Sequence, residues 1–89
     1  MGKAEISWKG KTPDGQKREV YVHMVGADWK FFVRGKRYDN WEPLENPLLE
    51  DYVELLDGVR RRIARRLVRP EEEQRVLRLI RESYPEAEI

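Results

Sequence analysis

Six arginines lie within one short segment of this 89-residue chain, GVRRRIARRLVR, from Gly58 to Arg69. A guanidinium presents its N–H donors in a planar fork that matches phosphate and carboxylate oxygens, so such a cluster is a candidate phosphate-binding surface. On a helical wheel, Arg61, Arg65 and Arg69 point to solvent, and Arg62 and Arg66 flank the apolar stripe. One of two candidate sites is a phosphate-binding face made of Arg61, Arg62, Arg65 and Arg69.

The arginine run also has a purely structural interpretation. Residues 42–57 carry six acids and no bases, and residues 58–69 carry no acids. A helix that is acidic at its start and basic at its end complements its own dipole, at about 0.3–1 kcal/mol per exposed charge. The cluster is therefore also explained as the basic end of an ordinary helix.

Specific ion pairs are expected around the arginines. Asp57 is placed to meet Arg61 one helical turn later, and Glu73 is placed to meet Arg66 across the turn that follows. Arg60 alone falls inside the apolar stripe, which predicts a structural arginine whose guanidinium snorkels to solvent or pairs with a carboxylate.

A second candidate site comes from residue types that alternate in the first half of the chain. If the apolar positions of the strands face a core, the opposite positions present aromatic and basic side chains: Tyr21, His23, Lys30, Phe32, Arg34, Arg37 and Trp41. Aromatics interleaved with cations are typical of sheets that stack nucleic-acid bases. The same pattern also suits cross-strand stabilising pairs, or a protein interface.

Residues that could perform catalysis are few. The chain has one histidine, His23, and no cysteine, and its hydroxyl residues (Ser7, Thr12 and Ser83) have no base at a useful spacing. Short glycine-containing stretches fit hairpin turns and lack the spacing of a phosphate-binding loop. We expect a protein that is not an enzyme and that carries no metal and no cofactor.

Composition sets further bounds. Charged and hydrophobic residues each make up 39% of the chain, while the net charge is only +1. Disorder usually combines low hydrophobicity with high net charge, so a folded domain is expected. No apolar run approaches the roughly 18 residues of a membrane span, and the start lacks the apolar core of a signal peptide. These features favour a cytoplasmic protein with no membrane partner.

The sheet that must position the aromatic residues is expected from period-two alternation. A loop at Val25–Asp28 keeps one face apolar, because it sets Val22 opposite Phe31. In that register Tyr21 lies opposite Phe32, Glu19 opposite Arg34, Met24 opposite Trp29, and Val20 opposite Val33. The expected apolar face is Ile6, Trp8, Val20, Val22, Met24, Trp29, Phe31, Val33 and Tyr38.

Residues 37–41 follow a possible turn at Gly35–Lys36. Whether they form a fourth strand stays open.

The second half of the chain changes to helical periodicity. Asn46 is expected to cap a helix that starts at Pro47 and runs to about Val68, with Gly58 on the face opposite the apolar stripe. A second helix is expected from Pro70 to Tyr84, with Leu77 and Ile80 facing inward. The sequence thus predicts one small two-layer α+β domain spanning residues 1–89. An antiparallel β-meander of three or four strands (1–41) precedes a helical hairpin (46–84) and a tail (85–89).

The predicted function follows from these exclusions. We expect a small non-catalytic interaction module that binds a protein partner, or a second copy of itself, through the outer face of the sheet. The alternative is nucleic-acid binding, either by that aromatic and basic face or by the arginine-rich helix.

Overall fold

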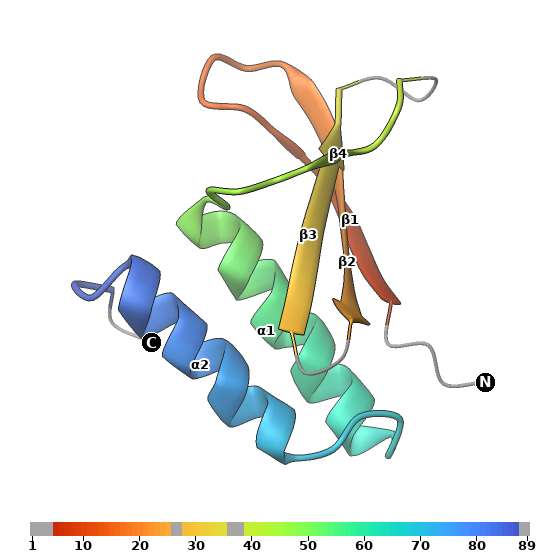
Figure 1. Cartoon of the computed structure of the whole chain (residues 1–89), viewed down its shortest axis with the longest axis vertical. Helices are drawn as coiled ribbons and strands as arrows, with labels where there is room; N and C mark the ends of the chain where they lie inside the picture. Colours follow the sequence, from red (N-terminus) through yellow and green to blue (C-terminus); the bar gives the residue numbers. More distant parts are fainter. Residues whose placement is uncertain (1–4, 26–27, 36–38, 88–89) are drawn as a thin grey trace. The chain divides into compact units, whose positions relative to one another are not determined.

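The chain forms a four-stranded antiparallel sheet followed by two helices, as a computed structural model of residues 5–25, 28–35 and 39–87 shows (Figure 1). The elements are β1 (Glu5–Lys11), β2 (Lys17–Val25), β3 (Asp28–Arg34), β4 (Glu42–Pro43), α1 (Leu49–Ala64) and α2 (Glu71–Ser83). The predicted α+β class, a meander followed by a helical hairpin, is confirmed. The chain divides between Asn46 and Pro47 into a sheet unit and a helical unit.

The predicted register between β2 and β3 is confirmed. Val22 pairs with Phe31, Tyr21 with Phe32, and Glu19 with Arg34. The ladder continues one pair further than expected, because Val25 pairs with Asp28, so these two residues belong to strands and not to the loop. β1 pairs with β2 on the other side and completes the predicted order of the first three strands.

A fourth strand exists, but it lies later than residues 37–41. β4 consists of Glu42 and Pro43, paired with Val33 and Phe32 of β3. Proline has no backbone N–H to donate, so an edge strand is where a sheet tolerates it. Residues 36–38, and with them the expected turn at Gly35–Lys36 and the inward placement of Tyr38, lie outside the described residues.

The turn between β1 and β2 is held by local hydrogen bonds. The Thr12 N–H donates to the Gln16 carbonyl at 2.8 Å, and the Gln16 N–H donates to the Thr12 hydroxyl at 3.0 Å. Gly15 has a φ of +88°, in the left-handed region that glycine enters without strain. Pro13 and Gly15 are residue types that favour such a turn, since proline pre-sets φ and glycine accepts a positive φ.

Alternation along the strands separates a buried face from a more exposed one. On the expected apolar face, Ile6, Val20, Val22, Trp29 and Phe31 are buried, and Trp8, Met24 and Val33 are half-buried. Trp8 also contacts Phe31 edge-on, with ring centroids 6.4 Å apart. Arg18, which was not expected on this side, is only 8% exposed.

α1 begins two residues later than predicted. The residue before the helix is Leu48, not Asn46, and its N–H donates to the Asp51 carboxylate at 2.8 Å. Asp51 is 2% exposed, so this bond is made in a buried environment, where it satisfies one of the free N–H groups at the helix start. A buried side-chain acceptor inside the first turn therefore replaces the expected cap at Asn46.

α1 also ends earlier than predicted, at Ala64 instead of about Val68. Arg66 adopts a left-handed backbone with a φ of 62°. The Leu67 N–H donates to the Arg62 carbonyl at 2.8 Å and the Arg66 N–H to the Ile63 carbonyl at 2.9 Å, which together form a Schellman motif. The apolar phase that continues to Leu67 therefore does not continue the helix, and Leu67 is 61% exposed.

The two helices run antiparallel, side by side (Figure 1), around a compact apolar core. The buried apolar residues of this unit are Tyr52, Leu55, Leu56, Val59, Val76 and Ile80. Gly58 is buried, contrary to the expectation that it faces outward. Two contacts join the start of α1 to the end of α2. The Tyr84 hydroxyl donates to the Pro47 carbonyl at 2.7 Å, and the Tyr52 hydroxyl lies 3.3 Å from the Ser83 hydroxyl.

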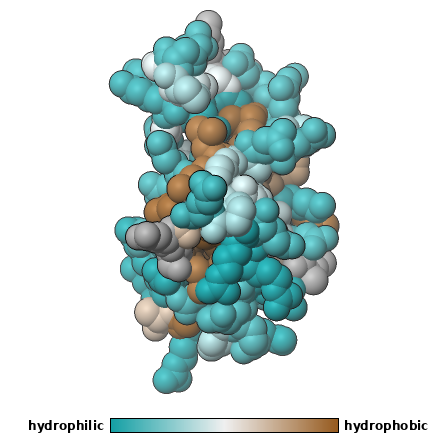
Figure 2. Space-filling view, turned by 90° about the vertical axis from the view of Figure 1, so that its left-hand side faces the viewer, coloured by the Kyte–Doolittle hydropathy of each residue, from teal (hydrophilic) through white to brown (hydrophobic). Residues whose placement is uncertain are grey.

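The surface is largely hydrophilic on the side of the molecule drawn in Figure 2, where brown apolar patches are broken up by teal residues. Val25, Val53 and Leu67 are the large apolar residues that stand out as exposed within the described part of the chain. No helix in that part is long and apolar enough to cross a membrane.

Replacing Asp51 by alanine should lower the free energy of unfolding by about 1 kcal/mol or more, because the Leu48 N–H loses its buried acceptor. Glu50→Ala, an exposed change in the same helical turn, should cost less than about 0.5 kcal/mol. Urea denaturation of both variants measures the difference. Equal costs would contradict the capping role of Asp51.

Replacing Arg66 by glycine should raise the free energy of unfolding by about 1 kcal/mol, because glycine enters the left-handed region without steric cost. The matched control is Arg65→Gly, since Arg65 has a φ of −93° and gains nothing from glycine there. The control should be neutral or destabilising. A destabilised Arg66→Gly in the same urea experiment would show that the Schellman turn is wrongly placed.

Candidate functional site

An uncharged row of side chains crosses the outer face of the sheet, the face opposite the buried residues Val20, Val22 and Phe31. Strand pairing sets Ser7 opposite Tyr21, Tyr21 opposite Phe32, and Phe32 opposite Pro43. Directly paired residues point to the same side of a sheet, so the four side chains form one line across four strands. We call this line the aromatic row.

Rings in and beside the aromatic row stack on one another. The Tyr21 and Phe32 centroids are 5.0 Å apart with planes at 17°. His23 stacks on both, at 5.4 Å from Phe32 and 5.5 Å from Tyr21, with planes at 8° and 18°. These distances fall in the range of favourable aromatic pairs, worth about 0.5–1.5 kcal/mol each beyond burial.

Trp41 closes one side of this cluster. Its ring meets Tyr21 edge-on, with centroids 4.7 Å apart and planes at 82°. The Arg34 guanidinium carbon lies 4.4 Å from the centre of the Trp41 ring, which is a cation–π contact. Arg34 also donates from Nη2 and Nε to one Glu19 oxygen, at 2.8 and 3.1 Å.

The mutual stacking decides what the cluster can do chemically. A platform for nucleic-acid bases needs ring faces that are open to solvent. Here part of the ring surface of Tyr21, His23 and Phe32 is taken up by contacts among the three rings, and Arg34 is already held by Glu19 and Trp41. The cluster therefore offers less open ring surface to a base than three separate aromatic side chains would.

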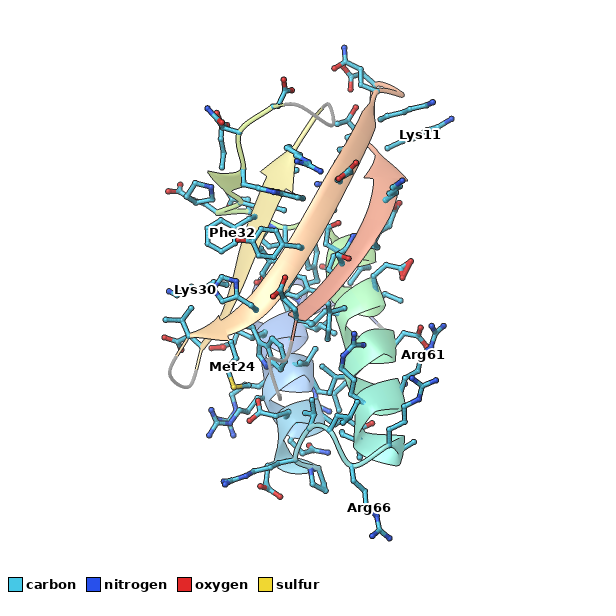
Figure 3. The ribbon with its side chains drawn as sticks, turned by 90° about the vertical axis from the view of Figure 1, so that its right-hand side faces the viewer. Lys11, Met24, Lys30, Phe32, Arg61 and Arg66 are labelled. Atoms are coloured by element: carbon cyan, nitrogen blue, oxygen red, sulfur yellow. The ribbon has the colours of Figure 1, made fainter. Side chains whose placement is uncertain are left out.

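Polar and charged residues form a row on each side of the aromatic row. Glu5, His23 and Lys30 stand on one side, and Lys9, Glu19 and Arg34 stand on the other. Lys30 is exposed, and Figure 3 shows it on the same side of β3 as Phe32. An aromatic centre between rims of mixed charge is the composition found at the cores and edges of protein interfaces.

The structure brings together most of the residues predicted for this face. Tyr21, His23, Phe32 and Trp41 make one cluster, Arg34 joins it, and Lys30 borders it. Arg37 lies outside the described residues. Sequence reasoning missed the contributions of Ser7 and Pro43, although the alternation that placed Ile6 on the buried face also predicts Ser7 on the other.

The predicted phosphate-binding set of Arg61, Arg62, Arg65 and Arg69 separates into two groups. Arg61 pairs with Asp57 at 2.7 Å, as expected, and Arg62 donates to the Gly58 carbonyl at 3.3 Å. Arg65 and Arg69 are exposed beyond the end of α1. The four arginines thus do not act as one helical face, because the helix ends at Ala64.

Glu73 was expected to pair with Arg66, and that prediction is wrong. The Glu73 carboxylate instead accepts from Arg60 Nε at 2.7 Å. The pairing was inferred by treating Arg66 as part of the helix. Arg66 lies beyond the helix end in a left-handed conformation, so its side chain does not have the direction that a helical residue would have. Arg60 is carboxylate-paired as expected, and its side chain remains 54% exposed.

Metal ligation and comparison with known proteins add no further site. Within residues 5–25, 28–35 and 39–87 no group of three or more histidine, cysteine or acidic side chains is arranged to hold a metal ion. No protein family, curated protein or solved structure matches the chain. The functional argument therefore depends on the chemistry of the surfaces themselves.

The Tyr21–Phe32 contact should show a coupling energy of about 0.5–1.5 kcal/mol in a double-mutant cycle of alanine variants measured by urea denaturation. The pairing of Lys11 with Lys17, both exposed at the end of the β1–β2 ladder, supplies a control cycle, and its coupling should be near zero or unfavourable because the two charges are alike. A coupling near zero for Tyr21 and Phe32 would contradict the stacked arrangement.

Proposed function

We propose that the chain is a non-catalytic interaction module whose outer sheet face docks onto a protein partner. The observation that carries the proposal is the aromatic row, in which Tyr21 and Phe32 stack at 5.0 Å between two rows of mixed charge. Interface hot spots favour tyrosine, tryptophan and arginine, surrounded by a rim that excludes water. Tyr21, Trp41 and Arg34 supply these residue types in one cluster.

Preorganisation supports the same proposal. Side chains already held by stacking and by the Glu19–Arg34 ion pair lose little rotational freedom when a partner docks. The cluster is also not fully packed away, because Tyr21, Phe32 and Trp41 are each half-buried. A rigid and partly exposed aromatic surface can therefore bind with a small entropic cost.

Nucleic acid is the less favoured occupant of this face. A base that stacks on Tyr21 or Phe32 would compete with the ring contacts that these residues already make with His23 and with each other. The net charge of +1 gives no general attraction to phosphates, which supply most of non-specific nucleic-acid affinity. The test below therefore also measures nucleic-acid binding, as a result that would contradict the proposal.

The test uses Ser7, an exposed residue in the aromatic row. Ser7→Arg places a long charged side chain in the row without removing any aromatic ring. Gln16→Arg, at an exposed turn position outside the row, is the matched control. Both variants should keep the wild-type free energy of unfolding to within about 0.5 kcal/mol, the usual range for surface substitutions.

A photo-crosslinking residue, p-benzoylphenylalanine, at position 7 should capture protein in cells, whereas the same residue at position 16 should not. The captured protein, or a second copy of the chain detected by sedimentation velocity, should then bind the purified wild type and the Gln16→Arg variant. Ser7→Arg should weaken that binding by about tenfold or more, because it puts a long charged side chain into the contact beside Tyr21, which an interface would have to desolvate.

Two results would contradict the proposal. One is a partner that binds Ser7→Arg as tightly as the wild type. The other is saturable binding of single-stranded RNA or DNA, measured by fluorescence anisotropy at two salt concentrations, that Ser7→Arg abolishes. In that second case the outer face would be a nucleic-acid surface.

A further inference from the structure

The turn between α1 and α2 presents guanidinium groups that nothing else in the described structure engages. Arg65, Arg66 and Arg69 are exposed, and none of their side chains makes a hydrogen bond or an ion pair within residues 5–25, 28–35 and 39–87. By contrast, Arg60 and Arg61 are paired with carboxylates. The charge of this turn is thus available to a ligand.

The same turn contains an open hollow with apolar walls. The volume of the hollow is about 300 Å³, and its lining residues are Ile63, Arg66, Leu67, Val68, Arg69 and Pro70. This volume lies at the lower end of ligand pockets, which span roughly 300–1,000 Å³. The hollow therefore suits one large side chain with its neighbouring atoms.

Hydrogen bonds at the helix end fix the backbone conformation of Arg66. Its left-handed φ of 62° is held by the Schellman hydrogen bonds of the helix end, from Arg66 N–H to Ile63 and from Leu67 N–H to Arg62. Figure 3 shows the Arg66 side chain extending outward from the end of the helical hairpin. Glycine is the residue that takes this conformation without strain, so an arginine here places a guanidinium at a position that the turn itself does not require.

We propose that this turn binds an acidic peptide segment of a partner protein, with one large apolar side chain in the hollow and flanking Asp or Glu carboxylates on Arg66 and Arg69. Guanidinium groups match carboxylates bidentately, and the apolar walls of Ile63, Leu67 and Val68 match an aliphatic side chain. The site shares no residue with the aromatic row, and the proposal does not rest on the proposed function of that row.

Other anionic partners fit the hollow less well. The sugar–phosphate backbone of DNA would pair with the arginines but has no apolar group to fill the hollow. A lipid surface would meet Leu67 and the arginines, but a flat surface leaves a concave hollow unfilled. Both partners are arms of the test below.

Acidic residues at the start of α2 set a limit on the attraction. Glu73 is occupied by Arg60, and Glu72 lies 3.7 Å from Arg75, so these two carboxylates have cationic neighbours. Glu71 is exposed and directly follows Pro70 of the hollow. Glu71→Gln should therefore strengthen peptide binding severalfold by removing a like charge.

The experiment is a titration of the ¹⁵N-labelled chain, followed by NMR, with the capped peptide GEELEEG. Amide shifts should cluster in residues 63–69, with a Kd on the order of 1 mM or tighter, as expected for one side chain and a few ion pairs.

Arg66→Gly keeps the turn and removes one guanidinium, and Arg69→Ala removes the second guanidinium. Each should weaken binding by about threefold to tenfold, since a charge-assisted hydrogen bond is lost. Arg78→Ala, which removes an exposed charge from α2, is the matched control and should change the Kd less than about twofold.

The peptide GEESEEG tests the hollow itself and should bind several times more weakly than GEELEEG. Equal affinity of the two peptides would overturn the proposal, as would the absence of shifts in residues 63–69 at millimolar GEELEEG. Tighter binding of a DNA duplex or of phosphatidylserine vesicles, lost in Arg66→Gly, would overturn it in favour of a phosphate ligand. Because Arg66→Gly is expected to stabilise the fold, loss of binding in this variant cannot be ascribed to unfolding.

Discussion

The antiparallel pairing of β2 with β3 is the constraint on which the outer face depends. It sets Tyr21 beside Phe32 and Glu19 beside Arg34, and it puts Val22 and Phe31 together on the buried face. A slip of one residue would exchange the two faces, so burial of the apolar side chains holds the register. The ion pair and the aromatic stack then reinforce a register that burial has already selected.

Strand periodicity carried most of what could be predicted about the sheet. A loop with an even number of residues sets Val20 and Val22 opposite the apolar residues Val33 and Phe31, and it sets Tyr21 opposite Phe32 on the other face, as the structure confirms. Periodicity did not predict where the fourth strand lies. The structure pairs Glu42 and Pro43 with β3 and packs the preceding residue, Trp41, against Tyr21 and Arg34, contacts that alternation along a single strand does not encode.

The helix ends were harder to predict, for a physical reason. Asn46 has a high propensity to cap a helix, but the buried carboxylate of Asp51 accepts the Leu48 N–H and moves the start. At the other end, the apolar spacing that reaches Leu67 suggests a continuing helix, while two hydrogen bonds around Arg66 stop it. Hydrogen-bond geometry at helix ends is decided by single groups, and a periodic pattern averages over them.

For the candidate sites too, the sequence pattern predicted where residues lie but not which contacts their side chains make. Alternation was sufficient to predict that Tyr21, His23 and Phe32 share the outer face. It could not tell that Arg34 is held by Glu19 and Trp41, or that Arg61 and Arg65 differ in their partners. Whether a cation is free or engaged depends on side-chain conformation, which spacing along the chain does not encode.

The strand order β1-β2-β3-β4 has a consequence for how the chain reaches its fold. Every strand pairs with its neighbour in sequence, and the two helices that follow are joined by a short turn. Closing short loops costs little chain entropy, so nearly all of these contacts form between nearby segments. Proteins of such low contact order fold faster than sheets whose strands pair out of sequence, and they expose unpaired strands for a shorter time during synthesis.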